Sequence, residues 1–241
     1  MQKYIIEIKN RVFLIFFSYF FTVIICYLYK ETLLFLSIKP SLSLLNQSNF
    51  YFISTNLTEI FTTYIQLACF VSAQFSIFYI LYHMTIFLAP ALYDLEYNNL
   101  KSILLVILWS WLVGVIILNF LILPRTWEFF MSFQGTINNQ SINLHFEAKI
   151  IEYLNFYINI YFICVLSCQF FFVLYIFLEF VSDKILFIKK FRKILYLVFL
   201  LIATIMTPPD VLSQILIATF FIVICEILIV SVILKNIYYK I

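Results

Sequence analysis

The sequence predicts an all-α, polytopic integral membrane protein with six transmembrane helices. Of its 241 residues, 65% are hydrophobic and only 11% are charged, against about 45–50% and about 25% in ordinary soluble domains. A soluble fold of this composition would lack the polar side chains needed to cover its surface, whereas lipid removes that need. Long uncharged stretches alternate with short charged segments, and basic residues are shared unequally between those segments.

The uncharged stretches define the spans. About 20 apolar residues are needed to cross a hydrocarbon core of about 30 Å. We predict a single membrane domain over residues 1–241 with six spans, at about 12–29, 60–92, 102–124, 153–178, 194–206 and 211–234. The first is expected to be a retained helix, because Glu7 lies in its flank and it has no small-x-small cleavage site. Pro90, Pro124, Pro208 and Pro209 lie at segment ends, where we expect them to terminate helices.

The basic residues predict the topology. Eleven of the fifteen Lys and Arg residues fall on one side of the predicted membrane, and the other side has Lys30, Lys39, Arg125 and Lys149. The positive-inside rule therefore places both termini inside. An even number of spans agrees with that placement. The longest loops, about 30–59 and 125–152, are then outside.

Polar side chains at or within the apolar stretches are the candidate functional residues, because unpaired polar groups are costly in lipid. By spacing alone, Glu7 and Glu96 are best interpreted as solvated interfacial residues, and Asp210 as the cap of a helix that begins at Val211. Glu226 lies fifteen residues into an apolar stretch, so it must face water or a partner. The sequence has no metal-ligand cluster, phosphate-binding loop or nucleophile–base arrangement, and we expect no cofactor and no enzymatic activity.

Residues 207–214 read Thr-Pro-Pro-Asp-Val-Leu-Ser-Gln. This segment closely resembles the Thr-Pro-Pro-Asp-x-x-Ser-Gln signature of the TatC family, the multi-spanning component of the twin-arginine protein translocase. Residues 7–11, Glu-Ile-Lys-Asn-Arg, are similar to the family's N-terminal Glu-Leu-Arg-x-Arg, and residues 87–93 with Glu96 resemble its Phe-x-x-Pro-Gly/Ala-Leu…Glu element. Tyr153-Leu154-x-Phe156 and Glu226-Ile227 also fit, so the resemblance extends from about Tyr4 to Ile229.

The chain departs from the family pattern at four positions. Lys9 replaces the usual Arg, Phe78 stands where Pro is common, Tyr97 stands where a basic residue is usual, and Phe171 stands where Pro often occurs. These changes bear on the strength of signal binding and leave the expected fold unchanged.

The resemblance implies a concave, glove-like arrangement of the six helices with both termini inside. It also implies a non-enzymatic function, namely recognition of twin-arginine signal peptides on folded cargo, powered by the proton-motive force. The implied partners are small single-span TatA/TatB-type subunits and further copies of the chain in a receptor complex, within the lipid bilayer. A net charge of +3 is too small to indicate nucleic-acid binding.

The resemblance also assigns residues to this function. It implies signal-peptide contacts at Glu7 and Glu96, with Lys9 and Arg11 in the same N-terminal motif. A carboxylate suits this task because it accepts both arms of a planar guanidinium, a geometry that a lysine ammonium lacks. Polar positions that contact partner helices or support the fold are implied at Gln169, Thr207, Pro208, Pro209, Asp210, Ser213, Gln214 and Glu226.

Two other classes of membrane protein fit the sequence less well. A respiratory-chain or ATP-synthase membrane subunit needs charged relays or His-ligated groups within its spans, yet no Lys or Arg lies within a predicted span and His83 has no second histidine nearby. A secondary transporter is expected to have internal repeats, and none is visible in the sequence.

The composition also bears on the compartment. The chain has 30 Phe but only 2 Gly, a bias typical of an A/T-rich genome such as that of an organelle. We therefore predict a mitochondrial inner-membrane location, with the bacterial plasma membrane as the main alternative and a plastid membrane third.

Overall fold

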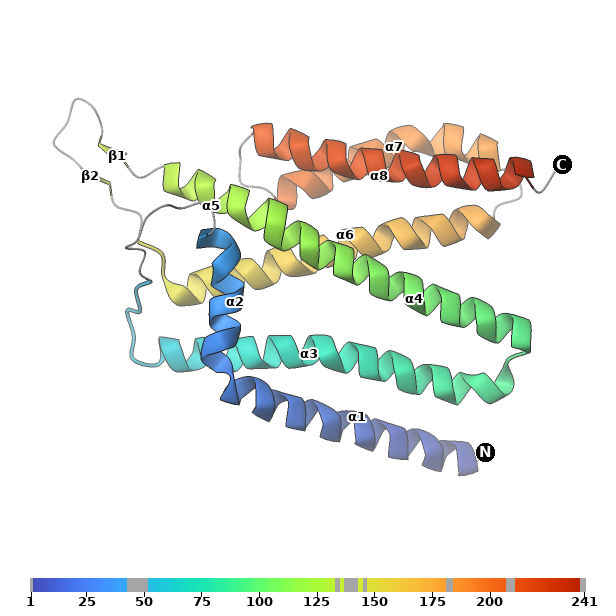
Figure 1. The fold of residues 1–241 in the computed structure, drawn as a ribbon, viewed down its shortest axis with the longest axis horizontal. Helices are drawn as coiled ribbons and strands as arrows, with labels where there is room; N and C mark the ends of the chain where they lie inside the picture. The colour runs from blue at the N-terminus through green and yellow to red at the C-terminus, as the bar shows by residue number, and fades with distance from the viewer. Residues whose placement is uncertain are drawn as a thin grey trace. The chain divides into compact units, whose positions relative to one another are not determined.

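The protein is almost entirely helical in its described parts. The computed structural model describes residues 2–42, 52–132, 135–136, 143–144, 147–180, 184–206 and 211–238. Within these residues lie eight α-helices (Figure 1): α1 Gln2–Leu28, α2 Lys30–Leu42, α3 Glu59–Leu88, α4 Asp94–Ile117, α5 Leu123–Ser132, α6 Ile150–Phe180, α7 Lys184–Met206 and α8 Val211–Tyr238. Two short strands, β1 Gly135–Thr136 and β2 Asn143–Leu144, pair antiparallel. The predicted all-α membrane fold is confirmed.

Four helical stretches of the described residues are long and apolar enough to cross a membrane. They are Tyr4–Leu28, Glu59–Ala91, Asp94–Ser132 and Ile150–Phe171, and they coincide with the first four predicted spans. Helices α7 and α8 lie at the last two predicted spans, and α7 begins ten residues before the apolar stretch that predicted it. The count of six spans, their limits and the inside location of both termini stay predictions.

The chain divides into two compact units. Unit 1 comprises Met1–Val106 and Glu147–Ile158, and unit 2 comprises Ile107–Phe146 and Asn159–Ile241. The boundary falls within α4 and α6, so each of these helices contributes residues to both units. The expectation of one six-span domain stays a prediction.

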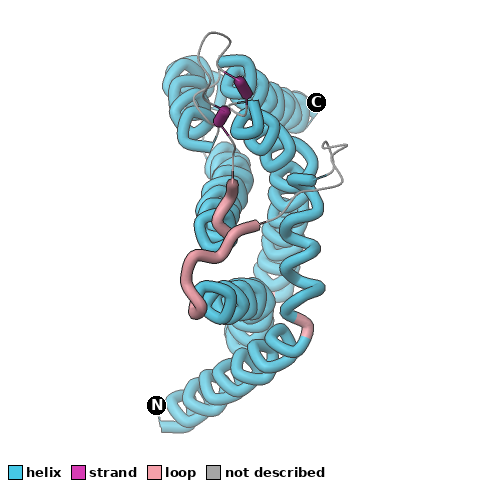
Figure 2. Tube along the Cα trace, turned by 90° about the vertical axis from the view of Figure 1, so that its left-hand side faces the viewer, coloured by secondary structure: helices cyan, strands magenta, loops and turns pink. Residues whose placement is uncertain are grey.

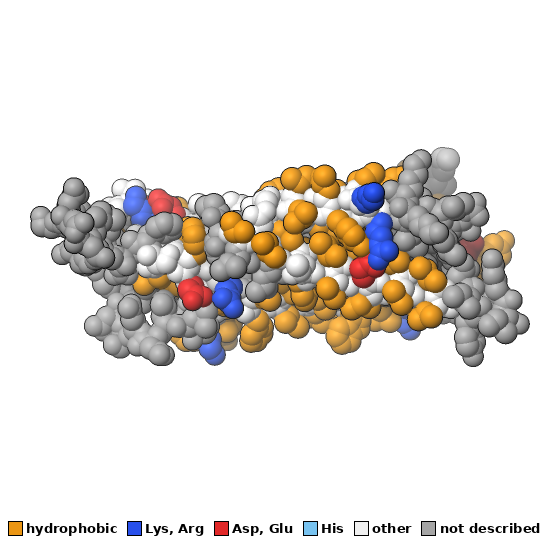
Figure 3. Space-filling model, turned by 90° about the horizontal axis from the view of Figure 1, so that it is seen from above, with side chains coloured by type: hydrophobic (Ala, Val, Ile, Leu, Met, Phe, Trp, Pro, Cys, Tyr) orange, Lys and Arg blue, Asp and Glu red, His pale blue; other side chains and the backbone are white. Residues whose placement is uncertain are grey.

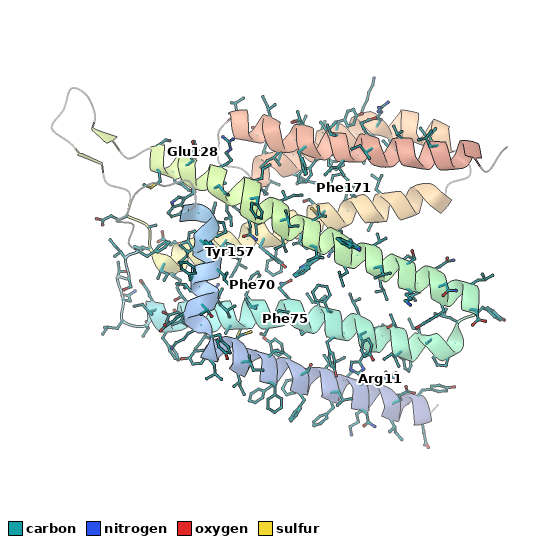
Figure 4. The ribbon with its side chains drawn as sticks, viewed as in Figure 1. Arg11, Phe70, Phe75, Glu128, Tyr157 and Phe171 are labelled. Carbon is teal, nitrogen blue, oxygen red and sulfur yellow. The ribbon has the colours of Figure 1, made fainter. Side chains whose placement is uncertain are left out.

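Unit 1 is built on the pairing of α1 with α3, which run in opposite directions (Figure 1). We call the end where α1 begins, α3 ends and α4 begins the inner end, after the predicted topology. The outer end is where α1 ends and α3 and α6 begin. Between α3 and α6, Phe70 meets the ring of Tyr157 edge to face at 6.2 Å (Figure 4), close to the buried Leu67 and Leu154.

The outer end of unit 1 is held by a buried tyrosine. Tyr153 of α6 donates a hydrogen bond to the carbonyl of Ser37 at 2.8 Å, and its hydroxyl lies 2.7 Å from that of Ser41. Its ring lies 5.2 Å from that of Phe52. We call Ser37, Ser41, Phe52 and Tyr153 the outer cap. These contacts attach α2 and the segment before α3 to the start of α6.

The loop segments beside the outer cap are also bonded to each other. The N–H of Ile53 donates to the carbonyl of Ala148 at 3.0 Å, and the N–H of Ile150 donates to Ile53 at 3.2 Å; Figure 2 shows these two loops in pink. Glu59 is buried at the start of α3 and accepts hydrogen bonds from the Thr55 N–H and hydroxyl, both at 2.7 Å. Its carboxylate therefore fixes the turn that leads into α3.

In unit 2, an aromatic cluster joins α6, α7 and α8. The ring of Phe171 lies 4.9 Å from that of Phe199 and 5.6 Å from that of Phe221, and all three are buried. Phe171 is one of the departures from the family pattern. Its aromatic ring fills the space between the two C-terminal helices, which a proline ring would fill less.

A close approach of α4 and α6 in unit 2 depends on Gly114. The Cys164 thiol donates to the Gly114 carbonyl at 3.3 Å. A Cβ atom at Gly114 would lie 3.4 Å from both the Cys168 sulfur and the Val165 Cα, which is the limit of ordinary contact. The absence of a side chain at Gly114 thus permits this close helix contact, and both cysteines act as small buried residues.

Pro124 does not end a helix as we expected. Leu118–Ile122 forms a π-helix in which the N–H of Leu123 donates to the carbonyl of Leu118, and α5 then continues to Ser132. Proline cannot donate to the preceding turn and its ring crowds that turn, but the wider π turn accommodates it.

Pro90 behaves as expected, because α3 ends at Leu88 just before it. Helices α2 and α5 thus occupy parts of the outer segments that we predicted as loops.

Most of the described surface is apolar. Figure 3 shows hydrophobic side chains over the middle of one face, with the few described charged side chains toward its ends. On α1, the rings of Phe13 and Phe16 are 64% and 67% exposed, and Leu28 is 73% exposed. Contact of such a surface with lipid or a partner helix is favourable, whereas its contact with water is unfavourable.

Candidate functional site

The N-terminal motif lies on the first turns of α1. The Nε and Nη2 atoms of Arg11 both donate to Oε1 of Glu7, at 3.0 Å and 2.5 Å. The two residues are four apart, the spacing that places side chains on one helical face. The guanidinium of Arg11 also lies 5.9 Å from the ring centre of Phe87 on α3. Arg11 therefore joins Glu7 to the end of α3, and Figure 4 labels it near the start of α1.

Glu96 lies at the start of α4 and has a clear local role. The chain leaves α3 through the single turn Ala89–Ala91, becomes extended at Leu92, and enters α4 at Asp94. Oε2 of Glu96 accepts the N–H of Tyr93 at 3.2 Å. This is half of a capping box, in which a glutamate at the third helical position bonds back to the residue before the helix. Glu96 is nevertheless exposed.

The structure places both predicted signal contacts at the inner end of unit 1. Glu7 is exposed on α1, and Glu96 is exposed where α3 passes into α4; these two places lie at the same end in Figure 1. Lys9 is also exposed on α1. Two accessible carboxylates at one end of the unit are suited to a ligand with more than one guanidinium group.

The other predicted positions fall into two groups. Gln169 in α6 and Gln214 in α8 are half-buried. Thr207, Pro208, Pro209, Asp210 and the side chain of Ser213 lie outside the part of the chain that the structure describes. The first four residues of the motif that most resembles the family signature therefore have no described geometry, and the roles of the motif stay predictions.

Glu226 has a partner within the chain. The Nε atom of Arg192 donates to Oε1 of Glu226 at 2.6 Å, its Nη2 bonds to Oε2, and the hydroxyl of Tyr196 bonds to Oε1. Hydrogen bonding to this carboxylate raises the pKa of the Arg192 guanidinium, so that group stays charged. The resulting ion pair links α7 to α8 and satisfies a carboxylate that lipid alone would destabilise.

Arg192 was not among the predicted site residues, although the sequence contains a signal for its pairing with Glu226. Arg192 lies fifteen residues before Thr207 and Glu226 lies sixteen residues after Asp210. If residues 207–210 join two antiparallel helices, such nearly equal distances bring the two side chains to about the same level. The helix pairing, read together with charge, would have predicted the ion pair.

We expect Arg192→Gln and Glu226→Gln each to lower the unfolding temperature in detergent by a few degrees. Each change leaves one charged group without its partner. In the reversed pair Arg192→Glu with Glu226→Arg, most of the loss should be recovered. The exposed pair Arg125 and Glu128, whose charged atoms lie 3.8 Å apart, is the control, and its neutralisation should have little effect. Failure of the reversed pair to recover any stability would argue against a direct ion pair.

The described fold defines a multi-pass helical membrane protein in which Glu7 and Glu96 are exposed at the inner end of unit 1. Residues 3–219 match the family described as Sec-independent protein translocase protein (TatC). The chain therefore belongs to the TatC family.

Relatives support this assignment over most of their length. An uncharacterized TatC-like protein of Nephroselmis olivacea is 32% identical over 210 residues, which cover 86% of this chain and 83% of that protein. The Sec-independent protein translocase protein TatC of Rickettsia prowazekii is 31% identical over 218 residues, or 88% and 84% of the two chains. A crystal structure of the twin-arginine translocase receptor TatC in DDM superposes with a TM-score of 0.65 at 19% identity, covering 95% and 98% of the two chains. This last similarity is one of fold.

Proposed function

We propose that this protein is the receptor for twin-arginine signal peptides in a Sec-independent translocase that exports folded proteins. Membership of the TatC family supports a role in protein translocation. The observation that carries the more specific proposal is the pair of exposed carboxylates, Glu7 and Glu96, at the inner end of unit 1.

The bonding of Glu7 suggests how a signal arginine is accepted. Both described bonds from Arg11 go to Oε1, so Oε2 is left to accept a guanidinium from the ligand. Arg11 is itself held over the Phe87 ring. The second signal arginine is assigned to Glu96, whose carboxylate is oriented by its bond to the Tyr93 N–H. Lys9 lies on the same stretch of α1 and contributes to the local charge.

The remaining assignments follow from the family. Small single-span TatA/TatB-type subunits and further copies of this chain are the proposed partners, and the proton-motive force is the proposed energy source. Gln169, Gln214 and the signature at residues 207–213 are proposed as polar positions that contact partner helices or support the fold. TatC-like relatives from Nephroselmis olivacea and Reclinomonas americana, together with the A/T-type composition, support a mitochondrial inner membrane, with the bacterial plasma membrane as the alternative.

Purification in mild detergent tests the class of function. We expect a small single-span protein to co-purify with the chain and the complex to have no visible absorption band. The bound subunit is identified by mass spectrometry of the complex. A stoichiometric haem or other chromophore would instead assign the chain to a redox membrane complex and overturn the proposal.

A further inference from the structure

A lysine at the outer end of unit 1 lies between two tyrosine rings. The ammonium nitrogen of Lys30 is 4.9 Å from the ring centre of Tyr27 and 4.9 Å from that of Tyr64. Tyr27 belongs to the last turn of α1, Lys30 begins α2, and Tyr64 lies on the facing helix α3. Backbone bonds from Tyr29 to Ile25 and from Leu33 to Tyr29 continue the helical pattern through this bend. Two helices therefore fix the position of one cation.

The location of this group matches the headgroup level of a bilayer. Lys30 follows directly on the apolar stretch Tyr4–Leu28, and Tyr64 lies five residues after Glu59, the first residue of the second apolar stretch. At 1.5 Å per residue, Tyr64 is only about 7–8 Å below the start of its helix. Lysine and tyrosine are enriched at this depth, where one part of the side chain is apolar and the other is wet.

Lys30 has no carboxylate partner among the described residues, whereas Lys149 of the same unit lies 3.8 Å from Glu152. Among the described residues no ion pair or hydrogen bond involves Lys30. A ring face attracts the cation but does not accept its three N–H donors in the way an oxygen does. The ammonium is thus held in place with its donors available.

The residues around Lys30 are suited to bind a lipid. Tyr27, Lys30 and Tyr64 are all half-buried, so a ligand can reach them. The same two helices expose Leu28 and Phe61, at 73% and 56%, to the surroundings of the protein. A ligand that carries an anionic phosphate next to apolar chains would satisfy both the cation and this apolar surface.

We propose that Lys30, Tyr27 and Tyr64 bind the phosphate of an anionic phospholipid in the outer leaflet. The ammonium and the two phenol groups supply N–H and O–H donors for the phosphate oxygens, and the rings hold the ammonium at the right level. The site would fix the bend between α1 and α2 to the membrane surface. It is independent of signal recognition at the opposite end of the unit.

Native mass spectrometry of the full chain tests this proposal. The protein is released from bilayers of equal parts phosphatidylglycerol and phosphatidylcholine, and the retained lipids are identified. We expect wild type to retain phosphatidylglycerol, and Lys30→Gln to lose at least about fivefold of it, roughly the effect of one lysine at an anionic surface. Lys39→Gln removes an exposed cation of α2 that no described ring contacts, and it should retain the lipid.

Two further variants and a competitor define the site. Tyr27→Phe with Tyr64→Phe keeps both rings and should retain more lipid than Tyr27→Leu with Tyr64→Leu. Excess inorganic phosphate should leave the lipid bound, because the acyl chains are held as well. Equal retention by wild type and Lys30→Gln would overturn the proposal, and displacement by phosphate alone would assign the site to a soluble anion instead.

Discussion

Replacing Glu7 and Glu96 together by glutamine should abolish cross-linking to a twin-arginine signal peptide while the protein still inserts in the membrane. Glutamine can still accept the Tyr93 N–H that Glu96 accepts at 3.2 Å, so the start of α4 is preserved and only the negative charge is lost. Each charge-assisted hydrogen bond contributes about 1.5–3 kcal/mol. Because both carboxylates are exposed, we expect the lower end, about tenfold in affinity for each single variant.

Controls separate the site from a general loss of charge. Glu152→Gln removes a carboxylate that is 71% exposed at the outer end of the same unit, and it should leave signal binding unchanged. Glu96→Ala removes both the charge and the helix cap, so it should lower stability as well as binding. Binding by the double glutamine variant at the wild-type level would remove Glu7 and Glu96 from the proposed site.

The largest loss of stability is expected at Tyr153. Truncation to alanine removes a ring that is 5% exposed and deletes its bonds to Ser37 and Ser41. Loss of a buried aromatic ring costs about 3–5 kcal/mol. Tyr153→Phe keeps the ring and removes only the two bonds of the hydroxyl to Ser37 and Ser41, which together cost about 1–3 kcal/mol. Thermal unfolding in detergent measures both.

Tyr157, one turn later on α6, is the matched control. Its ring packs against Phe70, and no hydrogen bond of its hydroxyl is described. Tyr157→Phe should therefore be close to neutral. If Tyr153→Phe were equally neutral, the outer cap would depend on packing of the ring alone, and its hydrogen bonds would have no measurable effect.

The long helices were predictable from the sequence because uncharged stretches leave little choice in lipid. The exceptions have local causes. Helix α2 (Lys30–Leu42) contains charged and polar residues and no long apolar stretch, so the sequence did not predict it. The continuation of α4 into α5 was not predicted either, because Pro124 indicated a helix end and a π turn is not visible in the sequence. Turns of this kind are set by packing around them, which a single sequence does not reveal.

The polar residues were predictable in kind, but their partners were not. Motifs pointed to Glu7, Glu96 and Glu226, and the structure adds that Glu96 caps α4 and that Glu226 pairs with Arg192. The stacking of Lys30 between two tyrosines needed knowledge of which faces of α1 and α3 meet. Contacts between segments far apart in sequence depend on helix rotation, which composition does not determine.

The most direct test of the account is photo-cross-linking from Leu95, which is 80% exposed beside Glu96. A photoreactive residue at this position is illuminated with a signal peptide that carries either two arginines or two lysines. We predict strong cross-linking to the twin-arginine peptide and much weaker cross-linking to the twin-lysine peptide. A photoreactive residue placed instead at the exposed Leu57, at the outer end, should cross-link neither peptide. Equal capture of both peptides at Leu95, or capture only at Leu57, would contradict a signal-peptide receptor site at the inner end.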